Sequence, residues 1–408
     1  MNHFNKFLSS GSRSLCAALL FFAVSTPIAA HSATYYVSLT GNDANPGTLS
    51  APFRTFAKAL TPLKPGDTLY IRGGLWTTQL DLMSPRVISG TSSAYVTIAG
   101  YPGETVTIRY ADTVSPGWGP IKARGAQGYL TFENLVLDGI NGPNKTGWQL
   151  PPGNHHFILR NLEIKNFRSS GLYIEANDVQ VINCTIHDQI SVSGSTGERW
   201  YGIYAHHGSN LLLQGNKIHH NPGGGVQLYP GPISNAVIRG NAIYNNNSLP
   251  SSVVGGIIVQ GTSTTSISNT QIYNNLVYRN GSSSAGYAPG IQVTYYTNGT
   301  KIWNNTVYAN NKWGIHIGWN STTVNTVVQN NISYGNTVGN YYNIGSGTIA
   351  SNNITTDPGF VDAATNNFAL RAGSVAIDRG ARLSSVVTDY RNFQRPRGAS
   401  HDVGGYEY

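Results

Sequence analysis

The sequence predicts an all-β chain wound into a parallel solenoid of short strands, and two observations lead to this fold class. Short aliphatic segments with alternating polar positions recur along most of the chain, and a period of two residues indicates strands rather than helices. The 47 glycines, with abundant Asn, Ser, Thr and Tyr, are typical of many short strands and turns. A chain of 408 residues could hold two average domains, but elongated all-β folds of this length often form one.

The beginning of the chain has the order of a secretory signal peptide. Lys6 and Arg13 precede the apolar run from Leu15 to Val24, and small residues follow. The apolar run is too short to span a bilayer as a permanent anchor. We therefore assign residues 1–33 to a leader, expect cleavage between Ala30 and Ala33, and expect the mature protein in the periplasm or outside the cell.

Charge and cysteine content narrow the partners of the mature chain. Lys6 and Arg13 are removed with the leader. The mature chain then has 24 of the 26 basic residues and 18 acidic residues, a formal charge of +6 (24 minus 18). This balance favours an acidic partner, and no lysine-rich tract or nucleic-acid motif competes with it. Cys16 also leaves, and the remaining Cys184 lies in a strand pattern, where we expect a small buried residue.

Residues 34–128 are predicted to form an N-terminal cap and the first coils. A strand opens the segment, a short helix follows around Phe53 to Leu60, and Pro65 to Asp67 turn the chain into a strand from Leu69 to Arg72. A solenoid requires such a cap, because its first coil would otherwise expose its core and its strand edges.

A repeat governs residues 129–336. Each unit has a strand, a turn with Asn, a second strand, a variable loop and a third strand that begins with Gly. Successive units are between 23 residues (Gly202 to Gly225) and 34 residues (Gly256 to Gly290) apart, enough for three short strands and three turns. The repeat weakens after about Thr337, and residues 337–408 are predicted to form the last coil and a C-terminal cap.

Asparagines recur at the turn between the first and second strands, where stacked amides can hydrogen-bond the next coil and stabilise the bend. We interpret this ladder as structural. Its expected members are Asn183, Asn216, Asn241, Asn275 and Asn305.

Alternation decides which side chains point away from the core. In the third strands the aliphatic residues fill the interior, and the positions between them face solvent. The first outward column is Tyr173, Tyr204, Gln227, Ile258, Gln292 and His316. The second is Glu175, His206, Tyr229, Gln260, Thr294 and Gly318. A third column, on the second strands, is Lys165, His187, His219, Tyr244, Tyr278 and Tyr308.

The third column lies across the variable loop from the first, so that Lys165, His187 and His219 are candidates for the opposite side of one cleft, with Arg199 from the loop. Its tyrosines are interpreted as a stabilising ladder. The adjacent pairs His206-His207 and His219-His220 are expected to point to opposite faces of a strand, so that only one of each pair can join an outward site. We therefore leave the metal ligands unassigned.

Both ends of the chain resemble a known family. The segments YYVS, GND, GT, PFRTFAKAL and PGDTLYIRGG, all within residues 35–74, resemble the opening of secreted right-handed parallel β-helix proteins, such as the family-nine pectate lyases. DPGF and AIDRG, within residues 357–380, resemble their terminal region. The resemblance implies a right-handed single-stranded β-helix of the pectate-lyase-like polysaccharide lyase superfamily. Calcium-dependent pectate lyases carry an Asp-rich calcium site and a Lys or Arg base on the groove strand. Neither is seen here, and calcium remains only an option.

A lyase is the favoured enzyme class. β-Elimination from a uronate sugar requires a cation or metal for the carboxylate, a base for the C5 proton and an acid for the O4 leaving group. The catalytic candidates are His206 as base, Tyr204 or Tyr229 as acid, and Lys165, Arg168 or Arg199 as cation. The substrate-binding candidates are Tyr173, Glu175, His187, His219, Gln227, Gln260, Gln292 and His316.

Three alternatives stay open. Hydrolysis needs two carboxyl groups beside the scissile bond, and Glu175 is the one acid that the pattern places in the groove. A uronate epimerase would use the same residues as a lyase. A non-catalytic secreted protein could bind a glycan with the same ladder. In each case we expect a monomer whose partner is an acidic polysaccharide or oligosaccharide, without nucleic acid or a membrane span.

Overall fold

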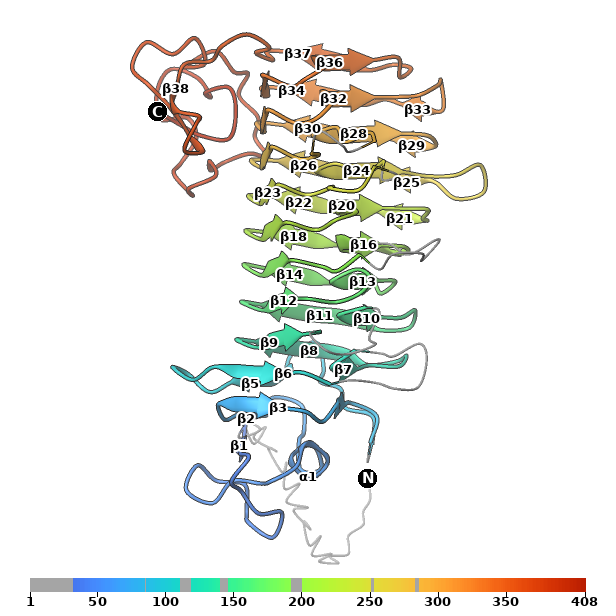
Figure 1. Ribbon diagram of the computed structural model, residues 1–408, viewed down its shortest axis with the longest axis vertical. Helices are drawn as coiled ribbons and strands as arrows, with labels where there is room; N and C mark the ends of the chain where they lie inside the picture. The colour runs from blue at the N-terminus through green and yellow to red at the C-terminus, as the bar shows by residue number, and fades with distance from the viewer. Residues whose placement is uncertain are drawn as a thin grey trace, which may run out of the picture. The chain divides into compact units, whose positions relative to one another are not determined.

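Three long parallel sheets run along the protein, one for each strand of the repeat (Figure 1). The structure is a computed structural model that describes residues 32–84, 86–110, 119–139, 146–191, 200–250, 253–282 and 286–408. The predicted leader lies outside these residues except for Ser32 and Ala33. Among the described residues, no helix is long and apolar enough to cross a membrane.

The first-strand sheet begins at the start of the described chain, so the N-terminal segment already contributes coils. Its inward side chains, for example Leu69, Ile98 and Leu159, are fully buried. Its strands, in spatial order, are β1 (Thr34–Val37), β2 (Thr68–Ile71), β5 (Val96–Gly100), β8 (Gly128–Glu133), β11 (His155–Arg160), β14 (Gln180–Ile182), β18 (Leu212–Gln214), β22 (Val237–Arg239), β26 (Gln271–Tyr273), β30 (Lys301–Trp303), β34 (Val327–Gln329) and β37 (Ile349–Ser351).

The second-strand sheet follows the Asn-bearing turn. From β9 onward its central residues, such as Ile186 and Ile218, are buried in the core. Its strands are β3 (Gly74–Trp76), β6 (Val106–Ile108), β9 (Val136–Asp138), β12 (Glu163–Lys165), β15 (Thr185–His187), β19 (Lys217–His219), β23 (Ala242–Tyr244), β27 (Leu276–Tyr278), β31 (Thr306–Tyr308) and β35 (Ile332–Tyr334).

The third-strand sheet follows the variable loops and carries the candidate site. Its strands are β10 (Trp148–Leu150), β13 (Leu172–Ile174), β16 (Tyr201–Ala205), β20 (Gly224–Leu228), β24 (Ile257–Gln260), β28 (Ile291–Thr294), β32 (Trp313–Ile317) and β36 (Gly339–Asn343). A glycine lies at or next to the start of each of these strands, because there is no room for a side chain there. At Gly202 a Cβ would lie 2.4 Å from Ile218 Cγ2 and 2.9 Å from the carbonyl oxygen of Gly225 in the next coil.

The remaining elements are short. The predicted helix is α1 (Phe56–Leu60), which begins where the Thr55 side chain accepts a hydrogen bond from the Lys58 backbone. A short parallel sheet after the third strands has β17 (Gly208–Ser209), β21 (Ile233–Ser234), β25 (Ile267–Ser268), β29 (Thr297–Asn298) and β33 (Thr323–Val324). Two further pairs are β4 (Leu80–Asp81) with β7 (Ile121–Lys122), and the antiparallel β38 (Phe360–Asp362) with β39 (Asn367–Leu370).

The asparagine ladder is confirmed from Asn216 onward, where each side-chain amide donates to the amide oxygen in the next coil. Those Nδ2–Oδ1 distances lie between 2.9 and 3.0 Å from Asn216 to Asn353. The prediction for Asn183 is wrong. It adopts a left-handed conformation (φ 53°), and the next residue, Cys184, occupies the ladder position, where its backbone N–H donates to Asn216.

A second ladder was not predicted. It lies at the end of the second strands, and its members are buried and joined by amide hydrogen bonds: Asn221, Asn246, Asn280, Asn310 and Asn336. Cys184 is a buried free thiol, as expected, and burial raises its pKa to about 12.

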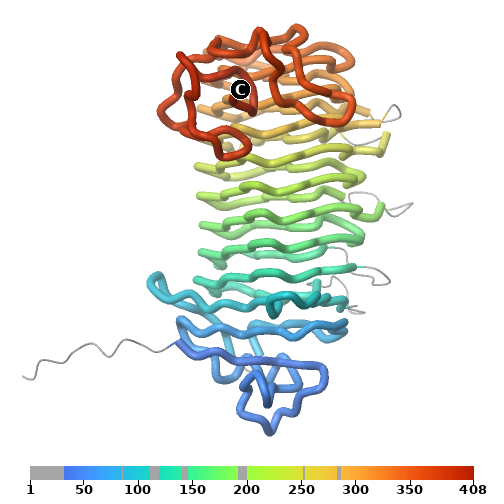
Figure 2. Tube along the Cα trace, turned by 90° about the vertical axis from the view of Figure 1, so that its left-hand side faces the viewer, coloured from blue at the N-terminus to red at the C-terminus, as the bar shows by residue number. Residues whose placement is uncertain are grey.

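The C-terminal segment folds back along the side of the last coils (Figure 2). Phe368 packs against Tyr278 and Tyr308, with ring centroids 5.0 and 5.4 Å apart. The second-strand tyrosines therefore form part of an apolar contact surface beneath this segment. Tyr244 stacks on Tyr278 at 4.9 Å, as expected of a ladder, whereas Tyr308 contacts Tyr334 and Phe368. The stabilising role of these tyrosines stays a prediction.

Candidate functional site

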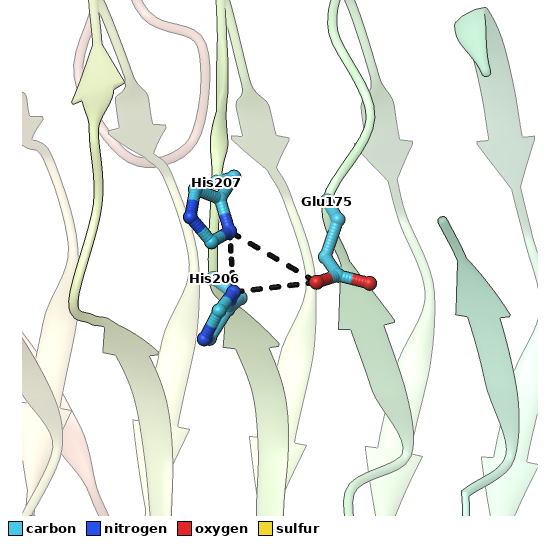
Figure 3. A group of neighbouring side chains, drawn as sticks. All are labelled: Glu175, His206 and His207. Atoms are coloured by element: carbon cyan, nitrogen blue, oxygen red, sulfur yellow. Dashed lines mark hydrogen bonds and ion pairs between the residues drawn. The ribbon is translucent and has the colours of Figure 1, made fainter. Parts of the chain in front are cut away.

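Glu175, His206 and His207 converge where two neighbouring third strands, β13 and β16, end (Figure 3). The Nδ1 atom of His206 lies 3.3 Å from Glu175 Oε1, and that of His207 lies 3.9 Å from the same oxygen. The two Nδ1 atoms also contact each other. The side chains are 14% (Glu175), 22% (His206) and 38% (His207) exposed, so the cluster is partly shielded but open to solvent.

The expectation that His206 and His207 point to opposite faces is wrong. Strand β16 ends at Ala205, and the chain turns immediately afterwards, with Gly208 at φ 117°. Strict alternation holds only while the backbone stays extended, so the turn brings both rings to one side. The same correction applies to His219 and His220, whose Nδ1 atoms are 2.8 Å apart because His220 is left-handed (φ 53°).

Aromatic and amide groups surround Glu175 and His206. The Tyr173 hydroxyl donates to Glu175 Oε1 (3.4 Å), and the Gln149 amide donates to Oε2 (3.3 Å). The Tyr173 ring stacks on the His206 imidazole with centroids 5.7 Å apart, and Tyr204 meets that imidazole edge-on at 5.7 Å. These contacts hold the carboxylate and the imidazole in fixed positions.

The first outward column has the predicted register, but most of it does not face solvent. Tyr173 pairs with Tyr204, and the pairing continues in step along the column. The side chains of this column point away from the core, but neighbouring residues cover them. Tyr287 from a variable loop, for example, contacts His316. The predicted exposure is therefore wrong for Tyr204, Gln227, Ile258, Gln292 and His316, which are all buried.

The second column is more open, although Thr294 and Gly318 are buried, so the prediction that Thr294 faces solvent is wrong. Glu175, His206, Tyr229 and Gln260 are all partly exposed. A groove lies beside Glu175 and His207, lined also by Asn177 and Ser209. A saccharide bound in it would reach the Glu175 and His207 side chains.

Lys165, His187 and His219 make their contacts within a different sheet. Lys165 Nζ and His187 Nε2 both contact Glu163 Oε1, at 2.6 and 3.1 Å. The rings of His187 and His219 stack at 4.9 Å. Burial, chiefly, lowers the pKa of His219 to about 4. These contacts form a second-strand cluster separate from His206, and the predicted Arg199 lies outside the described residues.

Glu175, His206 and His207 also form the one group of three or more metal-ligating side chains found in the described part of the chain, with ligand atoms within 4.8 Å of one another. Two nitrogens and one oxygen suit zinc or a similar divalent ion. They do not suit calcium, which binds six to eight oxygens. The donor set therefore disagrees with the calcium site of the resembling pectate lyases.

Sequence reasoning missed His207 and Gln149. Gln149 lies one coil before Tyr173 in the same outward column, and the pairing of β10 with β13 places it there. Gly147 directly precedes β10, as a glycine lies at or next to the start of the other third strands, but Trp148 stands where the repeat has an aliphatic residue. That initial glycine, 24 residues before Gly171, was the available signal. For His207, the following Gly208 was the available signal, because a glycine after a strand indicates a turn that ends the alternation.

The parallel coils and the polar cluster at the third-strand ends define a β-helix protein of the pectate-lyase-like class. Residues 35–367 match the model of the family described as Pel9A-like, right handed beta helix region. The chain belongs to this family, and its coils are right-handed.

The similar proteins agree with this assignment. Over 76 residues the chain is 37% identical to the pectate lyase PEL9 of Emericella nidulans, a match that covers 19% of this chain and only 18% of that protein. The solved structure of the pectate lyase Pel9A superposes with a TM-score of 0.67 at 19% identity, covering 92% of this chain and 96% of that one. A solved rhamnogalacturonan lyase gives 0.62 at 15% identity, covering 84% and 96%. The two solved structures establish the fold.

Proposed function

We propose that this protein is a polysaccharide lyase that cleaves a uronate-containing polysaccharide by β-elimination. The observation that carries the proposal is the contact between His206 and Glu175 at the end of neighbouring coils, in a chain of the Pel9A-like family. An imidazole held by a carboxylate is a suitable base near neutral pH.

His206 is the proposed base, with Glu175 as its positioning partner. A carboxylate without a proton can only accept a hydrogen bond, so the hydrogen facing Glu175 belongs to an Nδ1 atom, and His206 is the nearer at 3.3 Å. This assignment leaves Nε2 of His206 with the lone pair. Nε2 removes the C5 proton, the electron pair forms the C4–C5 double bond, and the C4–O4 bond breaks.

The departing O4 requires a proton donor. Tyr204 is fully buried, so we assign this role to one of the partly exposed tyrosines, Tyr173 or Tyr229. Lys165 is paired with Glu163, and we assign neutralisation of the substrate carboxylate to the exposed Arg168 or to Arg199. Activity measurements on Phe variants of the two tyrosines and Ala variants of the two arginines identify which member of each pair has the proposed role.

Hydrolysis is the weaker interpretation of this cluster. Both hydrolytic mechanisms require two carboxyl groups flanking the bond, about 5 to 10 Å apart. Among the described residues, Glu175 is the acid in contact with His206, whereas Glu163 and Asp188 contact His187 in the second-strand sheet. One carboxylate with one imidazole fits proton abstraction better.

The deciding experiment offers purified protein polygalacturonate, alginate and a glycosaminoglycan, with and without a chelator. We expect ultraviolet absorbance from an unsaturated uronate on at least one polymer. New reducing ends without that absorbance would establish hydrolysis and contradict the proposal. Uronate residues with inverted configuration at C5, in a polymer that is not cleaved, would indicate an epimerase. Binding of a polymer without any product would indicate a glycan-binding protein.

We also propose that the mature protein acts outside the cytoplasm. The support is the order of basic, apolar and small residues in positions 1–33. The full chain is expressed in a bacterium, and the exported protein is sequenced from its N-terminus. Cleavage after a residue between Ala30 and Ala33 should give a first residue between His31 and Thr34. A protein that stays in the cytoplasm with residues 1–33 intact would contradict the proposal.

A further inference from the structure

An aromatic cluster lies on the third-strand sheet, several coils away from His206. Trp319 is 42% exposed, although it is one of the largest apolar side chains in the protein. Its ring contacts the edge of His316 (centroids 4.5 Å apart) and the ring of Tyr287 (5.2 Å). Tyr342 also contacts His316, at 5.0 Å.

The supporting groups are fixed by hydrogen bonds. His316 Nε2 lies 3.0 Å from the carbonyl oxygen of Gly318, which can only accept, so Nε2 carries the hydrogen. Nδ1 is therefore the acceptor, and the Tyr287 hydroxyl donates to it at 2.7 Å. Trp319 therefore packs against side chains that hydrogen bonds hold in place. A ring whose motion is restricted in this way binds a ligand with little loss of conformational entropy.

Strand register places Trp319 on the same edge of the sheet as His207. Ala205 pairs with Leu228, and the pairing continues through the next two strands to Ile317. His207 and Trp319 each come two residues after these paired positions. Four steps of roughly 4.8 Å separate β16 from β32, a distance of about 19 Å along the sheet.

We propose that Trp319, with Tyr287 beside it, is a distal sugar-binding subsite for the polysaccharide that is cleaved at His206. The inference rests on the proposed function. A flat aromatic ring packs against the C–H face of a sugar, and the exposed Trp319 and the partly exposed Tyr287 lie side by side, with ring centroids 5.2 Å apart. A separation of about 19 Å requires several linked sugar units, so the subsite selects long chains over short oligosaccharides.

The test compares Trp319→Ala and Trp319→Phe with the unchanged protein. Binding to immobilised polygalacturonate and alginate is measured alongside binding of the matching trisaccharides. We expect Trp319→Ala to lose about tenfold in affinity for the polymer and nothing for the trisaccharide, with Trp319→Phe in between. Phe393→Ala is the matched control, because Phe393 is an exposed aromatic (46%) on the C-terminal segment.

The outcomes separate the subsite from the lyase activity. If Trp319→Ala binds polymer as tightly as the unchanged protein, or loses trisaccharide affinity equally, the subsite is refuted. If a polymer binds through Trp319 but no unsaturated product forms on any substrate, the subsite stands and the lyase proposal fails. Circular dichroism and melting temperature confirm that each variant is folded.

Discussion

At the scale of single residues, the turn at the end of β16 determines the chemistry available to His206. It brings His207 onto the same side and aims both Nδ1 atoms at Glu175. The imidazole of His206 is thereby held on three sides, by Glu175, His207 and the Tyr173 ring. A base held in this way needs little reorganisation when it takes up a proton.

Replacing His206 with Gln should lower kcat on the polymer substrate by about 100-fold or more, the usual contribution of a positioned general base. Glu175→Gln should cause a smaller loss, because it weakens the positioning of the imidazole without removing the base. Initial rates of ultraviolet absorbance measure both. His220→Gln is the control, since His220 directly follows β19 of the second-strand sheet, where its ring contacts His219 and Asn245. Activity in His206→Gln equal to that of this control would exclude His206 as the base.

Zinc should inhibit the enzyme, because an ion bound between Glu175, His206 and His207 would use the Nδ1 lone pair of His206. The imidazole hydrogen would then lie on Nε2, which could no longer accept the C5 proton. The rate is measured over a zinc titration and divided by the rate without zinc. The zinc concentration that halves this ratio should be higher for His207→Ala than for the unchanged protein. EDTA should reverse the effect. Activation by zinc would instead identify the three residues as a metal centre and overturn the assignment of His206 as the base.

At the scale of structural elements, two asparagine ladders hold the coils at the bends on either side of the second strands. Asn275 illustrates the arrangement. Its Nδ2 atom donates to the carbonyl oxygen of Ile238 (2.8 Å) and to Asn305 Oδ1 (3.0 Å), and its Oδ1 atom accepts from the Asn241 backbone (3.0 Å). The ladder therefore satisfies buried polar groups that the bend removes from the sheets.

Asn275→Ala should destabilise the protein by about 3 kcal/mol or more, because each stranded buried partner costs about 1–3 kcal/mol. Chemical denaturation followed by tyrosine and tryptophan fluorescence measures the loss. Asn269→Gly is the control, because Asn269 is exposed and left-handed (φ 55°), a conformation that glycine adopts freely. Equal stability of the two variants would argue against an energetic role for the ladder.

At the scale of the whole molecule, histidines far apart in the fold share one electrostatic property. Burial is the largest cause that lowers the pKa of His219, His316 and His401, each to about 4. The folded state therefore favours their neutral forms, whereas in the unfolded chain a histidine titrates near pH 6.5. Their contribution to stability is complete above about pH 6.5 and is lost as the pH falls toward 4.

We expect the free energy of unfolding to fall between pH 6.5 and pH 4, and His316→Gln to make that fall shallower. His316 is fully buried, so its removal should reduce the slope by up to about 1.4 kcal/mol per pH unit. Urea denaturation at intervals of half a pH unit measures the slope of each protein. Identical slopes would show that His316 does not titrate differently in the folded and unfolded states.

The candidate site was only partly predictable from the sequence. Period-2 alternation correctly placed Glu175 beside His206 and aligned Tyr173 with Tyr204. It failed at His207, because alternation ends where the backbone turns. It was also not extended to Gln149, because Trp148 replaces the aliphatic residue that follows the initial glycine in the other third strands.

The sequence by itself determined the coils, their register and the core. Hydrophobic alternation specifies register strongly, since a slip of one residue would turn every aliphatic side chain outward. Tertiary structure alone decided which outward positions stay accessible. Tyr204 and Tyr278 both point away from the coil interior, yet aromatic neighbours cover one and the C-terminal segment covers the other. Tyr201 lies on the same strand as Tyr204, but Tyr173 comes from the neighbouring coil and Phe368 from a distant segment. The local pattern around each tyrosine does not encode the approach of those two residues.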